Sequence, residues 1–529
     1  MDSVLSLQKE LSQDPYSVPL RIKLIEAYDT LKYPDLAAGE AYRAILLIDE
    51  VVDECGEFHE EALESARQYY GDVIHNGASI TTEAPADIDI IGHARAEWLS
   101  TLYIKIIRSL CACNCLKSAF EYSLRAVKGF PGHEALSKEH NQVLHAIRQH
   151  LESQGKSLDE NDVILDDLPD RGLVRRELYS WNEHEPDRFS ADAISSLNEQ
   201  MAISAPNLIV KSTQLPVLVQ HESRDETHTV KQLGVFAKND LEPGDIVLDE
   251  RSLLTAHLRF HDPFCDACGV PLAKLGSPGT DDYMPCLECD DVWFCSQNCH
   301  DLAQDFYHPA ICGTDVEVSA ADATAEEAAD ALYSLLLLRI LAMAETQEID
   351  PLDLNEVKYI WGDYTNTILG MGHGSEALRT LPFSFKYNIF LPLHMLEKMD
   401  VNIFETSTKY DFWVFNTLYA KFRGTASAKQ GLDGKPEIAA VHPLWCLANH
   451  SCDPNVTWEW RGSIRFTAKT ERAMWKGRDE RATPGIKKDE ELLSHYCDIE
   501  LPVKERREWA VGALGGMCMC KRCQWEEMQ

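Results

Sequence analysis

The chain is poor in basic residues. Its 529 residues include 50 Lys and Arg against 86 Asp and Glu, which leaves a formal net charge of −36 at pH 7. Because phosphate affinity depends on cationic side chains, this balance argues against direct nucleic-acid binding through a general basic surface. The acidity would instead attract basic protein partners, and the alternative is that it only keeps a large protein soluble.

The sequence also lacks a long uninterrupted hydrophobic run. The most apolar window, Ala331 to Ala344, contains Arg339 and is shorter than the roughly 20 residues of a bilayer-spanning helix, so we expect a buried helix and no membrane association. Met1 to Tyr16 shows no basic segment followed by an apolar one, so no secretory signal is expected. We therefore predict a cytoplasmic or nuclear protein, or one found in both. In such a setting 17 cysteines indicate reduced thiols and zinc ligands rather than disulfides.

Length and periodicity predict a multidomain α+β protein, because 529 residues exceed what one hydrophobic core supports. Residues 1–156 show apolar positions at helical spacing and predict an all-α domain. Ala119, Ala126 and Pro131 weakly resemble a tetratricopeptide repeat, and the alternative is an unclassified helical bundle. Residues 157–207 are acidic and irregular and predict a connector.

The rest of the chain alternates between strand and helix patterns. Strands are expected in 208–264 and again in 411–498, a cysteine-rich module in 265–312, helices in 313–410, and a cysteine-rich tail in 499–529. The clearest strand signal is a hairpin in which Val456, Trp458 and Trp460 alternate, the chain turns at Arg461-Gly462, and alternation resumes from Ile464.

Ten cysteines and one histidine form two metal-ligand arrays. The first, Cys265-x2-Cys268-x17-Cys286-x2-Cys289-x5-Cys295-x3-Cys299-x8-His308-x3-Cys312, has eight soft ligands in four pairs and predicts two tetrahedral Zn²⁺ sites of a structural kind. The second, Cys518-x-Cys520-x2-Cys523, has three ligands and requires a fourth. The triplet Cys111, Cys113 and Cys115 points in divergent directions on a helix and predicts packed thiols.

The first array resembles the MYND zinc finger. The heptapeptide Asn449-His-Ser-Cys-Asp-Pro-Asn455 resembles the central motif of SET-domain lysine methyltransferases. Gln232 to Asp245 is similar to the opening strand and turn of that domain, and Ile486 to Tyr496 is similar to the segment that ends in its catalytic tyrosine. The order of these motifs resembles the SET and MYND protein-lysine methyltransferase family over about residues 208–523.

The resemblance implies domains, cofactors and ligand sets. It implies a SET domain that is split by the MYND finger and by a helical insertion (313–410), with a catalytic core (411–498) and a post-SET zinc tail (499–529). It implies three zinc ions, whose ligand sets are Cys265, Cys268, Cys295 and Cys299; Cys286, Cys289, His308 and Cys312; and Cys452, Cys518, Cys520 and Cys523. On this reading Cys446 and Cys497 are packed thiols outside the pattern.

The resemblance also implies S-adenosylmethionine as cofactor and assigns roles at the site. Tyr496 would be catalytic and would orient a neutral lysine amine. The implied cofactor-binding residues are Gly234, Phe236, Asn416, Asn449, His450 and Tyr496, with His450 acting mainly through its backbone. The expected substrate is a basic lysine-containing protein, histone or not, and the MYND and helical domains are possible sites for peptide partners.

Three departures from the family pattern leave a rival function open. Gln232 replaces the first glycine of the opening strand, Leu514-Gly-Gly-Met517 replaces aromatic residues before the tail cysteines, and Lys469 to Thr483 is an added charged segment. That segment either borders the active site or is a surface loop. The rival is a catalytically weak or inactive adaptor that binds protein partners, and cofactor binding would separate the two.

Overall fold

A computed structural model describes residues 2–77, 86–156, 165–216, 229–258, 264–273, 277, 282–289, 292–315, 320, 323–364, 379–430, 436–478, 484–514 and 517–529. The chain forms two compact units. Unit 1 comprises Met1–Asn182 and Tyr364–Ala420, and unit 2 comprises Glu183–Asp363 and Lys421–Gln529. The predicted helical insertion 313–410 is therefore divided, because its residues from Tyr364 onward pack with the N-terminal helices.

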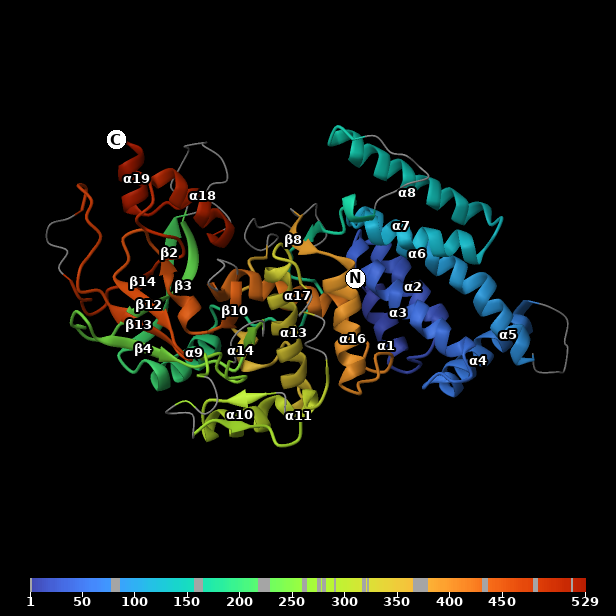
Figure 1. The fold of residues 1–529 in the computed structure, drawn as a ribbon, viewed down its shortest axis with the longest axis horizontal. Helices are drawn as coiled ribbons and strands as arrows, with labels where there is room; N and C mark the ends of the chain where they lie inside the picture. The colour runs from blue at the N-terminus through green and yellow to red at the C-terminus, as the bar shows by residue number, and fades with distance from the viewer. Residues whose placement is uncertain are drawn as a thin grey trace. The chain divides into compact units, whose positions relative to one another are not determined.

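Unit 1 is mainly helical. Its principal elements are α1 (Asp2–Leu11), α2 (Val18–Thr30), α3 (Pro34–Val52), α4 (His59–Gly77), α5 (Asp87–His93), α6 (Leu99–Ala112), α7 (Leu116–Gly129), α8 (Glu134–Ser153), α16 (Leu391–Lys398) and the first part of α17 (Phe412–Thr425), with β1 (Gly172–Arg175) paired to β8 (Arg379–Phe383). The helices α6, α7 and α8 pack one against the next (Figure 1). Ala119 and Ala126, two of the small residues in the tetratricopeptide resemblance, are fully buried in α7, and the repeat assignment itself stays a prediction.

The core of unit 1 contains paired charges. Glu40 of α3 accepts hydrogen bonds from Arg21 at 2.6 Å and Arg43 at 3.0 Å, and all three side chains are at most 1% exposed. Buried charges of this kind persist only when they are paired, so one carboxylate between two guanidinium groups joins α2 to α3. At Gly39 an added Cβ would lie 2.4 Å from the Phe412 ring, so α3 carries a glycine where α17 approaches it closely.

Unit 2 is built from short sheets. It contains the hairpin β2 (Leu208–Pro216) and β3 (Thr229–Ala237), the sheet β12 (Val456–Trp460), β13 (Ile464–Ala468) and β4 (Ile246–Glu250), the sheet β5 (Thr255–His257), β10 (Pro436–Val441) and β9 (Ala426–Gln430), the pair β6 (Met284–Pro285) and β7 (Trp293–Phe294), and the parallel pair β11 (Asn449–His450) and β14 (Leu493–Ser494). Its helices are α9 (Ala191–Ser204), α10 (Gln297–Phe306), α11 (His308–Ile311), α13 (Ala328–Thr346), α14 (Asn355–Lys358), α18 (Val503–Leu514) and α19 (Lys521–Glu527).

The observed elements confirm two predictions from the sequence and extend a third. The hairpin prediction is confirmed, since β12 and β13 pair antiparallel from Val456↔Ala468 to Trp460↔Ile464. The apolar window forms the buried helix α13, and none of the described helices combines the length and hydropathy needed to cross a membrane. The connector prediction for 157–207 was incomplete, because α9 forms there; the Ser190 hydroxyl caps it by accepting the Ala193 N–H at 3.1 Å.

Candidate active site and metal centres

The eight ligands of the first array form two separate groups. Cys265, Cys268, Cys295 and Cys299 form one group, and Cys286, Cys289, His308 and Cys312 form the other. In each group the potential ligand atoms lie within 4.8 Å of one another. The Cys268–Cys295 and Cys286–Cys312 sulfur pairs are both 3.8 Å apart. A tetrahedron with Zn–S bonds of about 2.3 Å has an S···S edge of about 3.8 Å, so both groups have the dimensions of a zinc site.

A buried ion pair ties the first cluster to the interior of unit 2. Arg339 of α13 donates to the Asp266 carbonyl at 3.0 Å and to its carboxylate at 3.3 Å, and both side chains are at most 5% exposed. The Tyr307 hydroxyl donates to the same carboxylate at 2.7 Å. Arg339, which interrupts the apolar window in the sequence, therefore anchors the segment that carries Cys265 and Cys268.

The third cluster joins the heptapeptide to the C-terminal tail. Cys452 and the three tail cysteines, Cys518, Cys520 and Cys523, have sulfur atoms within 4.8 Å of one another. Cys452 Sγ lies 3.9 Å from Cys518 Sγ and 3.4 Å from Cys523 Sγ, far beyond the roughly 2.05 Å of a disulfide bond. Cys452 is thus in the position of the fourth ligand that the tail array lacked.

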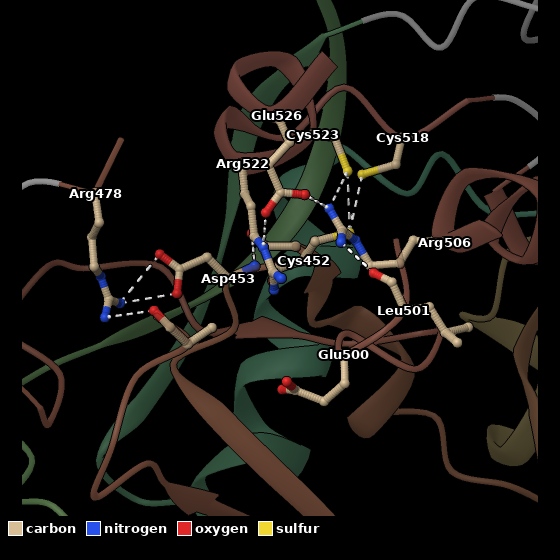
Figure 2. A network of polar contacts seen from close by, with 12 residues as sticks. Cys452, Asp453, Arg478, Glu500, Leu501, Arg506, Cys518, Arg522, Cys523 and Glu526 are labelled. Atoms are coloured by element: carbon tan, nitrogen blue, oxygen red, sulfur yellow. Dashed lines mark hydrogen bonds and ion pairs between the residues drawn. The ribbon is translucent and has the colours of Figure 1, made fainter. Parts of the chain in front are cut away.

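Three arginines surround this cluster. Arg506 of α18, only 1% exposed, donates to Cys523 Sγ at 3.6 Å and pairs with Glu526, while Arg522 donates to the Cys452 carbonyl at 2.9 Å (Figure 2). Arg507 donates to the Cys518 carbonyl at 3.1 Å. A guanidinium keeps its proton in proteins, so a buried one needs nearby negative charge. Four thiolates around one Zn²⁺ carry a net charge of −2, which fits this arginine shell.

The parallel pair β11–β14 brings the heptapeptide against the segment that ends at Tyr496. Asn449 pairs with Leu493, and His450 with Ser494. Asn455, which is 1% exposed, reinforces the pairing: its amide donates to the Glu491 carbonyl at 2.8 Å and accepts the Leu493 N–H at 2.7 Å. Asn455 is the last residue of the heptapeptide, and its position in the sequence alone did not indicate this role. The structure makes it the residue that fixes the register of these two segments.

Asn449, Gly234 and Glu491 meet at one point. The Asn449 amide donates both of its hydrogens, to the Leu233 carbonyl at 2.9 Å and to Glu491 Oε1 at 2.7 Å. A Cβ on residue 234 would lie 2.4 Å from the same Glu491 oxygen, so any larger residue there would displace this carboxylate from Asn449. Burial raises the pKa of Glu491, and the Asn449 hydrogen bond opposes that rise. Among the described residues, no donor contacts Asn449 Oδ1, which remains as an acceptor for a ligand.

His450 and Tyr496 are adjacent, with ring centroids 5.2 Å apart. The Tyr496 N–H donates to His450 Nδ1 at 3.0 Å, so a neutral imidazole carries its proton on Nε2, which lies 3.4 Å from Cys452 Sγ. Its side chain therefore links the third cluster to Tyr496, and its mainly backbone role toward the cofactor stays a prediction. The Tyr496 hydroxyl donates to the Ala448 carbonyl at 2.8 Å, and burial raises the pKa of this phenol.

Phe236 and Asn416, the other two residues predicted to bind the cofactor, have different surroundings. Phe236 is half-buried on β3, where its backbone bridges to Glu491 and Lys211 Nζ lies 5.5 Å from its ring. Asn416 belongs to unit 1, where it accepts a hydrogen bond from Asn388 at 3.1 Å and donates to Asp35 at 2.8 Å. Its amide is engaged in the core of that unit, and the cofactor roles of Phe236 and Asn416 both stay predictions.

The cysteines outside the zinc patterns also have defined surroundings. The Cys446 thiol donates to the Pro443 carbonyl at 3.1 Å, and Cys497 lies within 4.8 Å of both Cys452 Sγ and a His450 ring nitrogen. Cys497 is thus a neighbour of the third cluster. The sequence did not indicate this, because Cys497 is not part of the Cys-x-Cys-x2-Cys tail pattern. Cys111, Cys113 and Cys115 belong to no ligand cluster in the described parts of the chain, and burial raises the pKa of Cys111 to about 11.

Comparison with known proteins gives one distant relative. A SET and MYND domain-containing protein of Dictyostelium discoideum is 25% identical over 341 residues, which cover 57% of this chain and 59% of the relative. The chain thus spans less than two thirds of the relative's length. No family model matches the chain. The similarity and the three ligand clusters together indicate a distant relationship to SET and MYND domain proteins.

Proposed function

We propose that the protein is an S-adenosylmethionine-dependent protein-lysine N-methyltransferase. The observation that carries the proposal is the parallel pairing of β11 with β14, which puts Asn449 beside Glu491 and His450 beside Tyr496. Each of these residues comes from a motif that resembles the SET family, and the named relative is a SET and MYND domain protein. The three Cys-rich clusters fit three structural zinc ions, because each supplies four ligands and leaves no open position for catalysis.

The residues at this point suit a sulfonium cofactor. S-adenosylmethionine, when bound, supplies an electrophilic methyl group together with ammonium and sulfonium cations. Asn449 would hold it by accepting a hydrogen bond at Oδ1, since both hydrogens of its amide are already donated within the protein. Glu491 fixes that orientation. Gly234 leaves the space that the Asn449–Glu491 contact needs.

Tyr496 is suited to orient the substrate amine but not to deprotonate it. Its hydroxyl hydrogen is donated to the Ala448 carbonyl, so the phenol oxygen presents lone pairs that can accept an amine N–H. A raised pKa keeps the phenol neutral, which makes it a poor proton acceptor. The lysine ammonium, with a reference pKa of about 10.4, must therefore lose its proton to solvent water as it enters the site, where the loss of solvation disfavours the charged form. Tyr496 then holds the lone pair of the amine toward the methyl group.

Cofactor binding tests the proposal most directly. Isothermal titration of the zinc-loaded protein with S-adenosylmethionine should give one site per chain, and Asn449→Ala should weaken it. Radiolabelled methyl transfer to a pool of lysine-rich proteins, with acid hydrolysis to identify methyl-lysine, then tests catalysis. Binding without transfer would favour the adaptor function. Absence of binding by a folded protein that holds three zinc ions would reject the enzyme.

A further inference from the structure

The charged segment that the family pattern lacks is attached at its start to the heptapeptide. Residues Lys469–Arg478, here named the brace segment, are described, while 479–483 of the same addition lie outside the described residues. The Lys469 N–H donates to the Asn455 carbonyl at 2.9 Å, and its carbonyl accepts the Gly485 N–H at 3.3 Å. The added segment therefore begins and returns beside the last residue of the heptapeptide.

Arg478 connects the brace segment to the residue next to a zinc ligand. Its guanidinium donates to both oxygens of the Asp453 carboxylate, at 2.9 Å and 3.2 Å, and to the Ala473 carbonyl at 3.3 Å. The Arg478 and Asp453 side chains are only 14% and 17% exposed. Arg472, 10% exposed, adds positive charge 3.8 Å from the same carboxylate. A single guanidinium nitrogen, Nη2, contacts both carboxylate oxygens while Nη1 holds the Ala473 carbonyl, and the mostly buried pair has the shielding that exposed pairs lack.

A second contact joins the brace segment to the tail. The Trp475 and Trp525 rings have centroids 5.9 Å apart, and Trp525 belongs to α19, which also carries Cys523. At Gly477 an added Cβ would lie 2.5 Å from the Trp525 indole. The chain thus has a glycine where the brace segment lies on α19.

These contacts meet around Cys452. In Figure 2, Asp453 lies on the side of Arg478, and Cys452 lies on the side of the tail residues Arg522 and Arg506. Arg522 holds the Cys452 carbonyl, and Arg478 holds the next side chain along the chain. The ligand that the heptapeptide gives to the third cluster is therefore fixed from both directions.

We propose that the brace segment is a positioning element of the methyl-transfer site: through Arg478 it fixes Asp453 and hence Cys452, and through Gly477 and Trp475 it seats the tail helix α19. A simple surface loop would have no effect on the metal. The inference rests on the proposed function only for its effect on catalysis, because the effect on the zinc site is independent of any activity.

Zinc release from the full-length, zinc-loaded protein tests the inference. Arg478→Met should release one of three zinc ions to a chelating dye about tenfold faster than the unmodified chain, the low end of what loss of an outer-shell partner causes. Arg478→Lys should be intermediate, because it keeps the charge but loses the second guanidinium nitrogen that holds the Ala473 carbonyl. Gly477→Ile should match Arg478→Met through displacement of Trp525. Arg461→Met is the control, since Arg461 is 78% exposed and its ion-pair partner is Glu459 of the same hairpin.

Two further measurements identify the affected site. In a Cys452→Ser background, which removes the third cluster, Arg478→Met should leave the release of the remaining zinc unchanged. In methyl-transfer assays, Arg478→Met should lower kcat by a larger factor than it raises KM for the substrate. Equal zinc-release rates in all variants would overturn the proposed role of the brace segment. Faster release from Arg478→Met, in a protein that transfers no methyl group, would support that role and reject the proposed enzyme.

Discussion

At the scale of single residues, Tyr496 is the most direct test of chemistry. Tyr496→Phe removes one oxygen whose lone pairs would orient the amine, so we expect methyl transfer to fall by about 100-fold or more. Folding should change little, because the lost hydrogen bond to the Ala448 carbonyl is worth only about 1 kcal/mol. Initial rates with saturating cofactor measure the activity, and the zinc content checks that the variant is folded.

Tyr419→Phe supplies the matched control for that substitution. Its hydroxyl is also buried and donates to a main-chain carbonyl, that of Tyr387, at 2.7 Å, but it belongs to unit 1. The control should lose similar stability and keep its activity. Equal activity loss in both variants would mean that Tyr496 acts only through folding.

Cys452 and Cys497 are neighbouring thiols with different expected roles. The unmodified protein should hold three zinc ions per chain, and Cys452→Ser should hold two, because the third cluster then keeps only three thiolates. Cys497→Ser should still hold three, since its sulfur belongs to no complete set of four. Elemental analysis after gel filtration distinguishes these outcomes. If Cys497→Ser held two zinc ions and Cys452→Ser held three, Cys497 rather than Cys452 would be the fourth ligand of the third cluster.

The buried carboxyl of Glu250 predicts a pH dependence of stability. It accepts the N–H groups of Leu444 and Trp445, just before the heptapeptide, yet burial raises its pKa from 4.5 to about 7. Between these two values the folded state binds more protons than the unfolded state, so this residue destabilises the fold as pH rises from 4.5 to 7. The full effect is roughly 3 kcal/mol.

Glu250→Gln removes that titration and isolates its effect. The free energy of unfolding of the variant, minus that of the unmodified protein, should increase as pH rises from 5 to 8. A poorly accommodated amide hydrogen of the introduced glutamine would lower the stability of the variant equally at every pH and would not change this trend. Urea unfolding of the two proteins at both pH values gives the difference, in which the shared titration of the zinc ligands cancels. A constant difference would place the Glu250 pKa outside this range.

At the scale of elements, local patterns were predictable and long-range contacts were not. Alternation of large apolar residues predicted the β12–β13 hairpin, and an apolar run predicted α13. Cysteine spacing, with the family resemblance, predicted the ligand groups that the structure brings together. The Asn449–Glu491 and Arg478–Asp453 contacts join residues 42 and 25 positions apart, and depend on how β11 and the added segment pack rather than on any local pattern.

The C-terminal element has a testable role through its ligands. Deletion of residues 515–529 removes α19 and three of the four ligands of the third cluster, and leaves Arg506 and Arg507 of α18 without Glu526 and Glu527. We expect the truncated protein to hold two zinc ions and to lose as much methyl transfer as Cys452→Ser. Metal analysis and rates for the two variants side by side provide the comparison. Loss of zinc with full activity would separate the tail from the site.

At the scale of the whole molecule, the division into two units shows where reading along the sequence fails. Residues 364–410 were assigned to the same insertion as α13, because helical patterns continue through both. The structure instead places Tyr364–Ala420 with the N-terminal helices. Tyr28 and Gln8, for example, both donate to the Asp411 carboxylate, at 3.0 Å and 2.9 Å. Helical periodicity records which face is buried, but not which distant helix covers it.

The net charge of −36 leads to the last prediction, which concerns substrate choice. An acidic enzyme attracts a basic substrate over distances of about a Debye length, roughly 10 Å at 0.1 M salt, and added salt screens that attraction. For a lysine-rich protein substrate, kcat/KM should fall roughly tenfold between low and high salt, mainly through KM. A peptide with the same target lysine but no net charge should change little, and kcat should stay constant for both. If both substrates respond equally to salt, the acidity serves solubility, and substrate selection depends on short-range contacts at the site.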